Sequence, residues 1–225
     1  MQEIKTWGWT LPSKLIDRQE AIIFLCKDKS VLHLGCVDFP VTQEQIDKKR
    51  FLHTKIMSVA RKVTGIDNNR SGIELLCKHG INNIVEADAE HLNKLDIGTF
   101  EVVIAGEILE HLKNPGFFLE GVKKFMNSES LLVISVPNAF CLRRFLWIPF
   151  RKEKVHPDHC YYFSHATLSH LLESCGYLLV NKSSYCFKDI NFSLAGTIEK
   201  IASFLSPNFC EGLFYIAKKS GDKKG

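Results

Sequence analysis

Apolar and polar residues along this chain fall into blocks of two kinds. Short runs rich in valine, isoleucine and leucine alternate with longer stretches in which apolar residues recur every three or four positions. The runs that predict strands are residues 31–35, 62–67, 83–88, 101–105 and 131–138. Alternation of this kind predicts an α/β fold, a mostly parallel sheet with helices on both faces.

Helical periodicity between these runs covers residues 42–62, 70–80 and 115–127. In the first stretch Thr42 and Gln45 have the spacing of a capping box, which predicts one helix that begins there. After residue 138 the pattern changes, because two further strand-like runs, 177–185 and 212–220, are separated by a helical stretch. These two runs predict a hairpin-like pair that completes the sheet.

Composition narrows the class of protein. A chain of 225 residues that is 45% hydrophobic is expected to form one domain with elaborations, and a net charge of +4 is too small to indicate nucleic acid. The eight cysteines include no C-x-x-C pair, which predicts reduced thiols. The sequence shows no signal peptide and no apolar run long enough to cross a bilayer, so we expect a soluble, cytoplasmic protein. Peripheral contact with a membrane is compatible with this expectation.

Candidate chemistry lies just after the predicted strands, because ligands of open α/β sheets bind outside the carboxyl ends of the strands. Asp67 can accept hydrogen bonds from both ribose hydroxyls of a nucleoside, or it can simply cap the next helix. Asp88 can present a polar edge to an adenine ring, or it can end its strand in a plain turn. The candidate cofactor-binding residues are Gly35, Asp67, Asn68, Asp88, Ala89 and Glu107.

Six motifs in order carry a family resemblance: VLHLGC, VTGIDNN, VEADAEHL, FEVVIAGEILEHLKNPGFFLEGV, LLVISVPN and HPDHCYYFSHATLSHLLESCGY. Together they resemble the class I S-adenosylmethionine-dependent methyltransferases, in the branch with ubiquinone-biosynthesis and cell-surface-glycan enzymes. The resemblance covers about residues 30–185. It implies S-adenosylmethionine as cofactor and a Rossmann-like seven-stranded, mostly parallel sheet whose last strand is antiparallel.

The first motif departs from the family pattern V-L-D-L-G-C-G-x-G. His33 stands where an acid is usual, and Val37 and Phe39 stand where glycines are usual. Loss of these glycines removes left-handed backbone conformations and adds side chains near the cofactor. Two readings follow: a loop that takes another path and still binds, or a degenerate domain without catalysis. The first is favoured because Asp67, Asp88 and Glu107 are all present.

The segment GEILEHL raises the question of a metal. If it were helical, Glu107, Glu110 and His111 would share a face and, with His156 or His159, could hold a divalent ion. Similar Glu-x-x-Glu-His elements hold a metal in some members of the family. Otherwise Glu107 lines the cofactor site, and His111, or His159 as second choice, acts as the base. The pattern allows a divalent metal but does not favour one.

The expected domain organisation has three parts: an N-terminal helical cover over residues 1–29, a methyltransferase domain over 30–220, and a disordered tail over 221–225. Two insertions, 141–156 and 189–208, are expected to act as lids. The first is basic, with interleaved aromatic residues, and fits an anionic or amphiphilic acceptor such as a sugar nucleotide, a lipid-linked saccharide or a phospholipid surface. A partly buried crossover with a solvated basic edge fits it equally well.

The resulting expectation is an enzyme that moves a methyl group from S-adenosylmethionine to an oxygen, or as second choice a nitrogen, of a small-molecule or glycan- or lipid-linked acceptor. A non-catalytic methyltransferase-like subunit and a metal-dependent RNA 2′-O-methyltransferase are the alternatives. Nucleic acid is disfavoured as a partner. The absence of G-x-G-x-x-G argues against a nicotinamide-dependent reductase.

Overall fold

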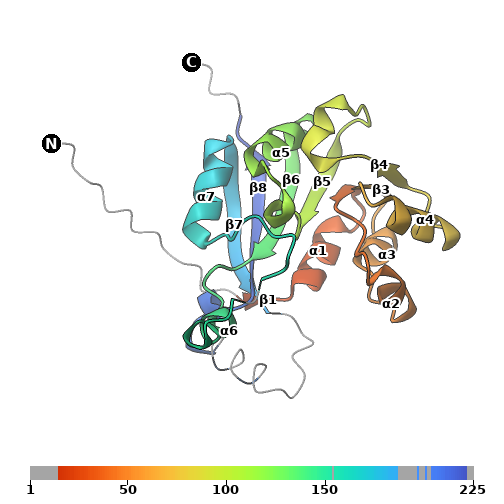
Figure 1. The fold of residues 1–225 in the computed structure, drawn as a ribbon. Coiled ribbons are helices and arrows are strands. Elements are labelled where there is room, and N and C mark those ends of the chain that lie inside the picture. Colours follow the sequence, from red (N-terminus) through yellow and green to blue (C-terminus); the bar gives the residue numbers. More distant parts are fainter. Residues whose placement is uncertain (1–14, 154, 187–196, 198–200, 202–203, 222–225) are drawn as a thin grey trace.

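A computed structural model describes residues 15–153, 155–186, 197, 201 and 204–221 of the chain (Figure 1). Part of the expected N-terminal cover, much of the second expected lid and most of the tail lie outside the described residues. Among the described helices, none is long and apolar enough to cross a membrane.

The described strands form one sheet in the order β1-β7-β8-β6-β5-β2-β3-β4. All neighbouring pairs are parallel except those made by β8, which runs antiparallel to both β6 and β7. The mostly parallel sheet and its antiparallel last strand are confirmed, and the two-residue β1 is an addition at the edge. The strands are β1 (Leu15–Ile16), β2 (Ser30–Leu34), β3 (Lys62–Asp67), β4 (Ile84–Glu86), β5 (Phe100–Gly106), β6 (Met126–Pro137), β7 (Tyr177–Tyr185) and β8 (Gly212–Lys219).

Helices cover both faces of the sheet (Figure 1). On one face the core joins β5 and β6 to α5 and α7 through Phe118, Leu119, Leu168 and Leu172. On the other face α1 and α3 bury side chains such as Ile22 against β2 and β5. The α-helices are α1 (Arg18–Cys26), α2 (Thr42–Asp47), α3 (Leu52–Met57), α4 (Arg70–Lys78), α5 (Pro115–Val122), α6 (Leu142–Phe145) and α7 (His165–Ser174).

Short 3₁₀ helices complete several connections. They are η1 (Ala89–Lys94), η2 (Leu109–His111), η3 (Lys123–Phe125), η4 (Ile148–Phe150) and η5 (Pro207–Phe209). The 3₁₀ helix η2 follows β5, and the basic segment after β6 contains α6 and η4. The connections after the carboxyl ends of β5 and β6 therefore carry many of the residues that the sequence singles out.

The single helix expected over residues 42–62 is wrong. The chain forms α2 and α3 instead, and between them Lys49 has a left-handed conformation with φ 54°. The expected capping box is also absent, since Val41 occupies the cap position and the buried Thr42 hydroxyl has no hydrogen-bond partner among the described residues. Burial of Phe51, 1% exposed, against Leu76 explains the break, because a continuous helix could not turn that side chain inward.

Candidate active site

A hollow of about 670 Å³ opens at the carboxyl ends of β2 and β5. Its size is within the range of small-molecule sites, and its position is where open α/β sheets bind ligands. Side chains from α1, β2, the loop after β2 and the end of β7 meet around it. Residues that matter for its chemistry are Arg18, His33, Gly35, Asp38, Gly106 and Tyr185.

Two glycines keep the floor of this hollow open. Gly35 has φ +64°, and a Cβ there would lie 3.1 Å from the Ile108 side chain. At Gly106 the constraint is on space and not on backbone conformation, because a Cβ there would lie 2.6 Å from the Arg18 guanidinium. Gly35 therefore supplies a left-handed turn, and Gly106 supplies the room in which an arginine crosses the end of β5.

Arg18 is one of three cationic residues that line the hollow, together with Arg50 and Lys55. Its Nε donates to the Ser135 hydroxyl at 2.8 Å, and its guanidinium lies 5.8 Å from the centroid of the Tyr185 ring. No carboxylate among the described residues lies within ion-pair distance of it. Arg18 is thus positioned by a neutral hydroxyl and an aromatic face, which leaves guanidinium N–H donors for an anionic ligand.

Asp67 anchors the loop after β2. One carboxylate oxygen accepts the Val37 N–H at 2.8 Å and the other accepts the Asn69 N–H at 2.9 Å, and the residue is only 9% exposed. Burial raises the pKa of the Asp67 carboxyl, and the N–H groups of Asn69 and Val37 oppose that shift. The side chain that caps α4 is Asn69, not Asp67.

The two residues that replace family glycines have different environments. Val37 packs against α4 at Gly72, where a Cβ would overlap the valine methyl group. Phe39 lies at the rim of the hollow and is 55% exposed. A glycine on the facing helix thus accommodates the valine, which is the arrangement expected of a loop that takes another path.

This packing gives a stability prediction for Gly72→Ala. Alanine is normally favoured over glycine inside a helix by up to about 1 kcal/mol, yet here its methyl group overlaps Val37. We expect Gly72→Ala to lower the free energy of unfolding by about 1–2 kcal/mol, as overpacking does. In a Val37→Ala background the same change should be neutral or stabilising. Urea unfolding of the four proteins tests this, and additive effects would contradict the packing argument.

Glu107 follows β5 in a strained conformation. Its φ is 55°, which is uncommon for a residue with a side chain, and its N–H donates to the Ser135 carbonyl at 2.8 Å. The Tyr185 hydroxyl donates to the Glu107 carboxylate at 2.5 Å. Strain of this kind persists where surrounding contacts enforce it, and it clusters at functional sites.

Glu110 is buried close by and is 1% exposed. Neither of its carboxylate oxygens has a hydrogen-bond partner among the described residues. Burial, followed by the charge of Glu107, raises the pKa of Glu110 to about 9. Burial therefore favours the protonated, uncharged form of this side chain.

Glu107, Glu110 and His111 do not share a helical face. The helical part, η2, is only three residues long, and Glu107 precedes it in a left-handed conformation. Glu110 consequently points into the core while His111 is exposed. The two glutamates and the histidine do not form one set of metal ligands.

Asp88 acts as a local cap. One of its oxygens accepts the Glu90 N–H at 2.9 Å, and the other lies 2.9 Å from the His91 ring nitrogen. The backbone N–H of Glu90 holds the pKa of Asp88 below its ordinary value. Asn68, after β3, is exposed, and Ala89 is half-buried. None of these three residues lines the hollow, so their predicted contact with an adenine ring stays a prediction.

Three histidines come together beside η2. His111 and His159 have ring centroids 4.6 Å apart, and His156 lies 5.6 Å from His111 and 5.2 Å from His159. Burial and the neighbouring imidazoles lower the pKa of His159 to about 4, and the same causes lower that of His111. The rings of His111 and His159, the two candidate bases, are thus uncharged at pH 7.

A second histidine pair lies beneath the hollow. The Nδ1 atoms of His33 and His53 are 3.1 Å apart, so one ring donates to the other, and the Nε2 atom of His53 lies 3.4 Å from the side-chain amide oxygen Oδ1 of Asn83. Burial lowers the pKa of His53 to about 4 and that of His33 well below its ordinary value. The histidine that replaces the family acid therefore forms a neutral, buried contact under the hollow.

The basic segment after β6 is tied to the body by two arginines. Arg143 pairs with Glu211, and Arg144 donates to the Asn138 carbonyl at 2.8 Å with its guanidinium 4.9 Å from the Tyr162 ring. Farther along, Phe150 is exposed together with Arg151 and Lys152. The segment is thus held to the body near its start, and its basic and aromatic residues are exposed farther along.

Arg18 and Tyr185 are the site residues that sequence reasoning missed. Arg18 precedes the family motifs and Tyr185 follows the last of them, so neither has a motif position that marks it. An arginine one residue after the helix-capping Asp17 was the available signal. It gives no indication that the side chain reaches Gly106.

Comparison with known proteins gives one match to a protein family. A model described as a methyltransferase domain matches residues 13–182. That range includes the three histidines beside η2 and every residue that lines the hollow except Tyr185 and Cys186. No curated protein matches the chain.

Many solved structures share the fold. A S-adenosylmethionine-dependent methyltransferase from Archaeoglobus fulgidus is 21% identical, with a TM-score of 0.58 over 89% of this chain and 90% of that one. The 1,6-didemethyltoxoflavin N1-methyltransferase of Burkholderia thailandensis, solved with 1,6-didemethyltoxoflavin and S-adenosylhomocysteine, is 15% identical, with a TM-score of 0.57 over 90% and 77%. A chain from the structure described as a complex between the Haloferax volcanii Trm112 methyltransferase activator and the putative methyltransferase is 13% identical, with a TM-score of 0.61 over 90% and 88%.

Proposed function

This chain belongs to the class I S-adenosylmethionine-dependent methyltransferases, and we propose that it transfers the methyl group to an oxygen of a small-molecule or glycan- or lipid-linked acceptor. Nitrogen is the second choice of acceptor atom. The hollow at the ends of β2 and β5 would hold the cofactor, with Gly35 allowing its close approach to the backbone.

The observation that carries this proposal is that residues of both charges line the hollow, among them Arg18 and Asp38. The amino-acid end of S-adenosylmethionine bears a carboxylate and an ammonium group. Arg18 offers free guanidinium donors to the carboxylate, and Asp38 lines the same hollow and can accept from the ammonium group. Arg18 and Asp38 would thus hold the amino-acid end of the cofactor by charge complementarity.

The nucleoside end of the cofactor would lie toward β3 and β4. Each Asp67 oxygen accepts one backbone N–H, and a carboxylate oxygen can accept a second bond, so a ribose hydroxyl can still be held. Asn68, Asp88 and Ala89 would border the adenine ring, and Glu107 would border the ribose side. Asp67 would then position both the loop and the ligand.

Methyl transfer needs an in-line attack and a route for one proton. S-adenosylmethionine would supply the methyl group: the acceptor oxygen would bond to the methyl carbon, the carbon–sulfur bond would break with its electron pair left on sulfur, and the acceptor would release one proton. His111 or, as second choice, His159 would take the proton, since both rings have a free lone pair at pH 7. An exposed edge with Phe150, Arg151 and Lys152 supports an acceptor that is anionic or amphiphilic.

Calorimetric titration with S-adenosylhomocysteine tests the assignment of the hollow. We expect Arg18→Met to weaken binding by at least tenfold, because a charged hydrogen bond contributes about 1.5–3 kcal/mol. Arg70→Met is the matched control, since Arg70 is exposed on α4 and pairs with Glu74 on the same helix. Equal affinity of Arg18→Met and wild type, or tighter binding of NADH than of S-adenosylhomocysteine, would contradict the proposal.

A further inference from the structure

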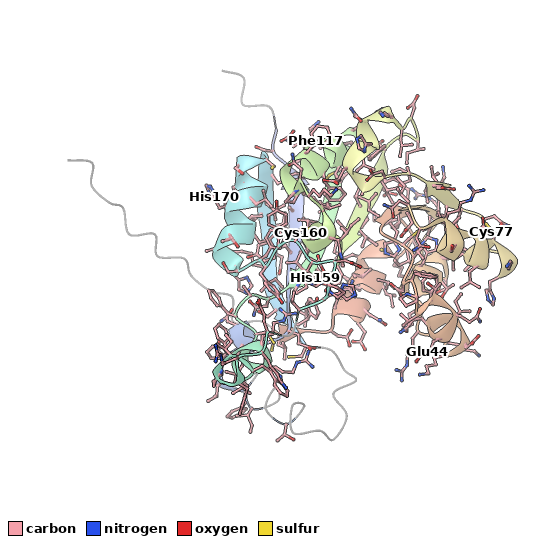
Figure 2. The ribbon with its side chains drawn as sticks, in the orientation of Figure 1. Glu44, Cys77, Phe117, His159, Cys160 and His170 are labelled. Atoms are coloured by element: carbon pink, nitrogen blue, oxygen red, sulfur yellow. The ribbon has the colours of Figure 1, made fainter. Side chains whose placement is uncertain are left out.

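The three histidines beside η2 come from two separate parts of the chain. His111 ends η2, whereas His156 and His159 belong to the loop between η4 and α7. Each ring offers one nitrogen such that all three nitrogens lie within 4.8 Å of one another. Figure 2 shows His159 with Cys160 near the middle of the molecule, well apart from His170 on α7.

The ring of His111 meets the other two rings edge-on. It is inclined by 86° to His159 and by 78° to His156, whereas the rings of His156 and His159 are tilted by 36° to each other. The Nδ1 atom of His159 is buried and has no hydrogen-bond partner among the described residues. A buried polar atom without a hydrogen-bond partner is rare in folded proteins, and it can mark the place where a ligand binds.

Hydrogen bonds hold the loop in this position independently of any ligand. The Glu110 carbonyl accepts the N–H groups of Cys160 and Tyr161, at 2.7 and 3.3 Å. The Tyr161 hydroxyl donates to the Lys113 carbonyl at 2.9 Å, and the Asp158 N–H donates to the His156 ring at 3.3 Å. The backbone thus brings the three imidazoles together before any ion binds, which lowers the cost of binding.

We propose that His111, His156 and His159 bind one transition-metal ion of the Zn²⁺ type. Imidazole nitrogen suits Zn²⁺, Cu²⁺ and Ni²⁺, whereas Mg²⁺ prefers oxygen ligands. With Zn–N bonds of about 2.0–2.1 Å, tetrahedral ligand nitrogens are about 3.4 Å apart, so small ring rotations from the observed spacing close the site. Three protein ligands leave the fourth position for water or a ligand oxygen.

This ligand set differs from the one considered at the level of sequence. That set relied on Glu107 and Glu110, and the structure removes Glu110 into the core. A metal held by imidazoles would also exclude His111 and His159 as proton acceptors, because its bonds use their lone pairs. Metal occupancy therefore decides between the two roles of these rings.

Metal binding can be measured without turnover. Tag-free protein is stripped with a chelator, dialysed and titrated calorimetrically with Zn²⁺, and the visible spectrum is recorded with Co²⁺ as a probe of tetrahedral coordination. We expect one Zn²⁺ per chain, an intense tetrahedral Co²⁺ spectrum and no measurable Mg²⁺ binding. His159→Gln and His111→Gln should each weaken Zn²⁺ binding at least tenfold.

His170→Gln is the control, since His170 is exposed on α7 and away from the cluster. It should bind Zn²⁺ as the wild type does. The proposal would be overturned if the folded wild type did not bind Zn²⁺, or if His170→Gln weakened Zn²⁺ binding as much as His159→Gln does. Titration of the same samples with S-adenosylhomocysteine keeps the two proposals separate, because the cofactor site does not require the histidines.

Discussion

Replacement of Asp67 by alanine should weaken S-adenosylhomocysteine binding by about 2–3 kcal/mol, roughly 30- to 150-fold. The carboxylate accepts the N–H groups of Val37 and Asn69, and we propose that it also accepts a ribose hydroxyl. The alanine variant loses the ligand bond and leaves the loop after β2 unanchored. Calorimetric titration, with thermal melts to establish folding, measures the effect.

Two variants separate these contributions. Asp67→Asn keeps one carbonyl oxygen for one of the two N–H donors, so its affinity should fall between those of wild type and Asp67→Ala. Asp96→Ala is the control for loss of a negative charge, because Asp96 is exposed. Unchanged affinity in a folded Asp67→Ala protein would show that this carboxylate has a purely structural role.

Glu110→Gln should change the pH dependence of stability. The folded pKa of Glu110 is about 9, well above its ordinary value, so the folded chain binds a proton that the unfolded chain releases near pH 4.5. The stabilising contribution of that proton is present below the unfolded pKa and is lost as pH rises toward the folded pKa. Glutamine has no such proton to lose.

The measurable quantity is the difference in the free energy of unfolding between wild type and Glu110→Gln. One proton corresponds to about 1.4 kcal/mol per pH unit, so from pH 6 to pH 8 the wild type should lose up to about 2.7 kcal/mol relative to the variant. Glu74→Gln, on the exposed face of α4, should follow the wild type. Parallel curves for wild type and Glu110→Gln would mean that Glu110 is ionised in the folded protein.

Most of the sheet could be predicted from local pattern. The apolar runs at 31–35, 62–67, 101–105 and 177–185 became β2, β3, β5 and β7 with small shifts at their ends. A buried strand in a parallel sheet needs a continuous apolar run, so its position is written in consecutive residues. The helical pattern of residues 42–62 did not give one helix, because Phe51, between α2 and α3, is buried by tertiary packing.

The site could be predicted only as a location. Parallel strands end at one edge of the sheet, so residues after β2, β3 and β5 had to lie near one another, and Gly35 does line the hollow. The sequence could not show that Asp67 points into the loop, or that Gly72 leaves room for Val37. These facts depend on distances between side chains far apart in the chain.

The sequence by itself determined the order of strands and helices, the class of fold and the family, because periodicity and motif order are local properties of the chain. Tertiary structure alone decided the chemistry. It brought Arg18 across Gly106 in the hollow, buried Glu110 without a hydrogen-bond partner among the described residues, and gathered three histidines from segments 45 residues apart and more. The physical reason is that burial and charge depend on which segments pack together, and no local pattern records that choice.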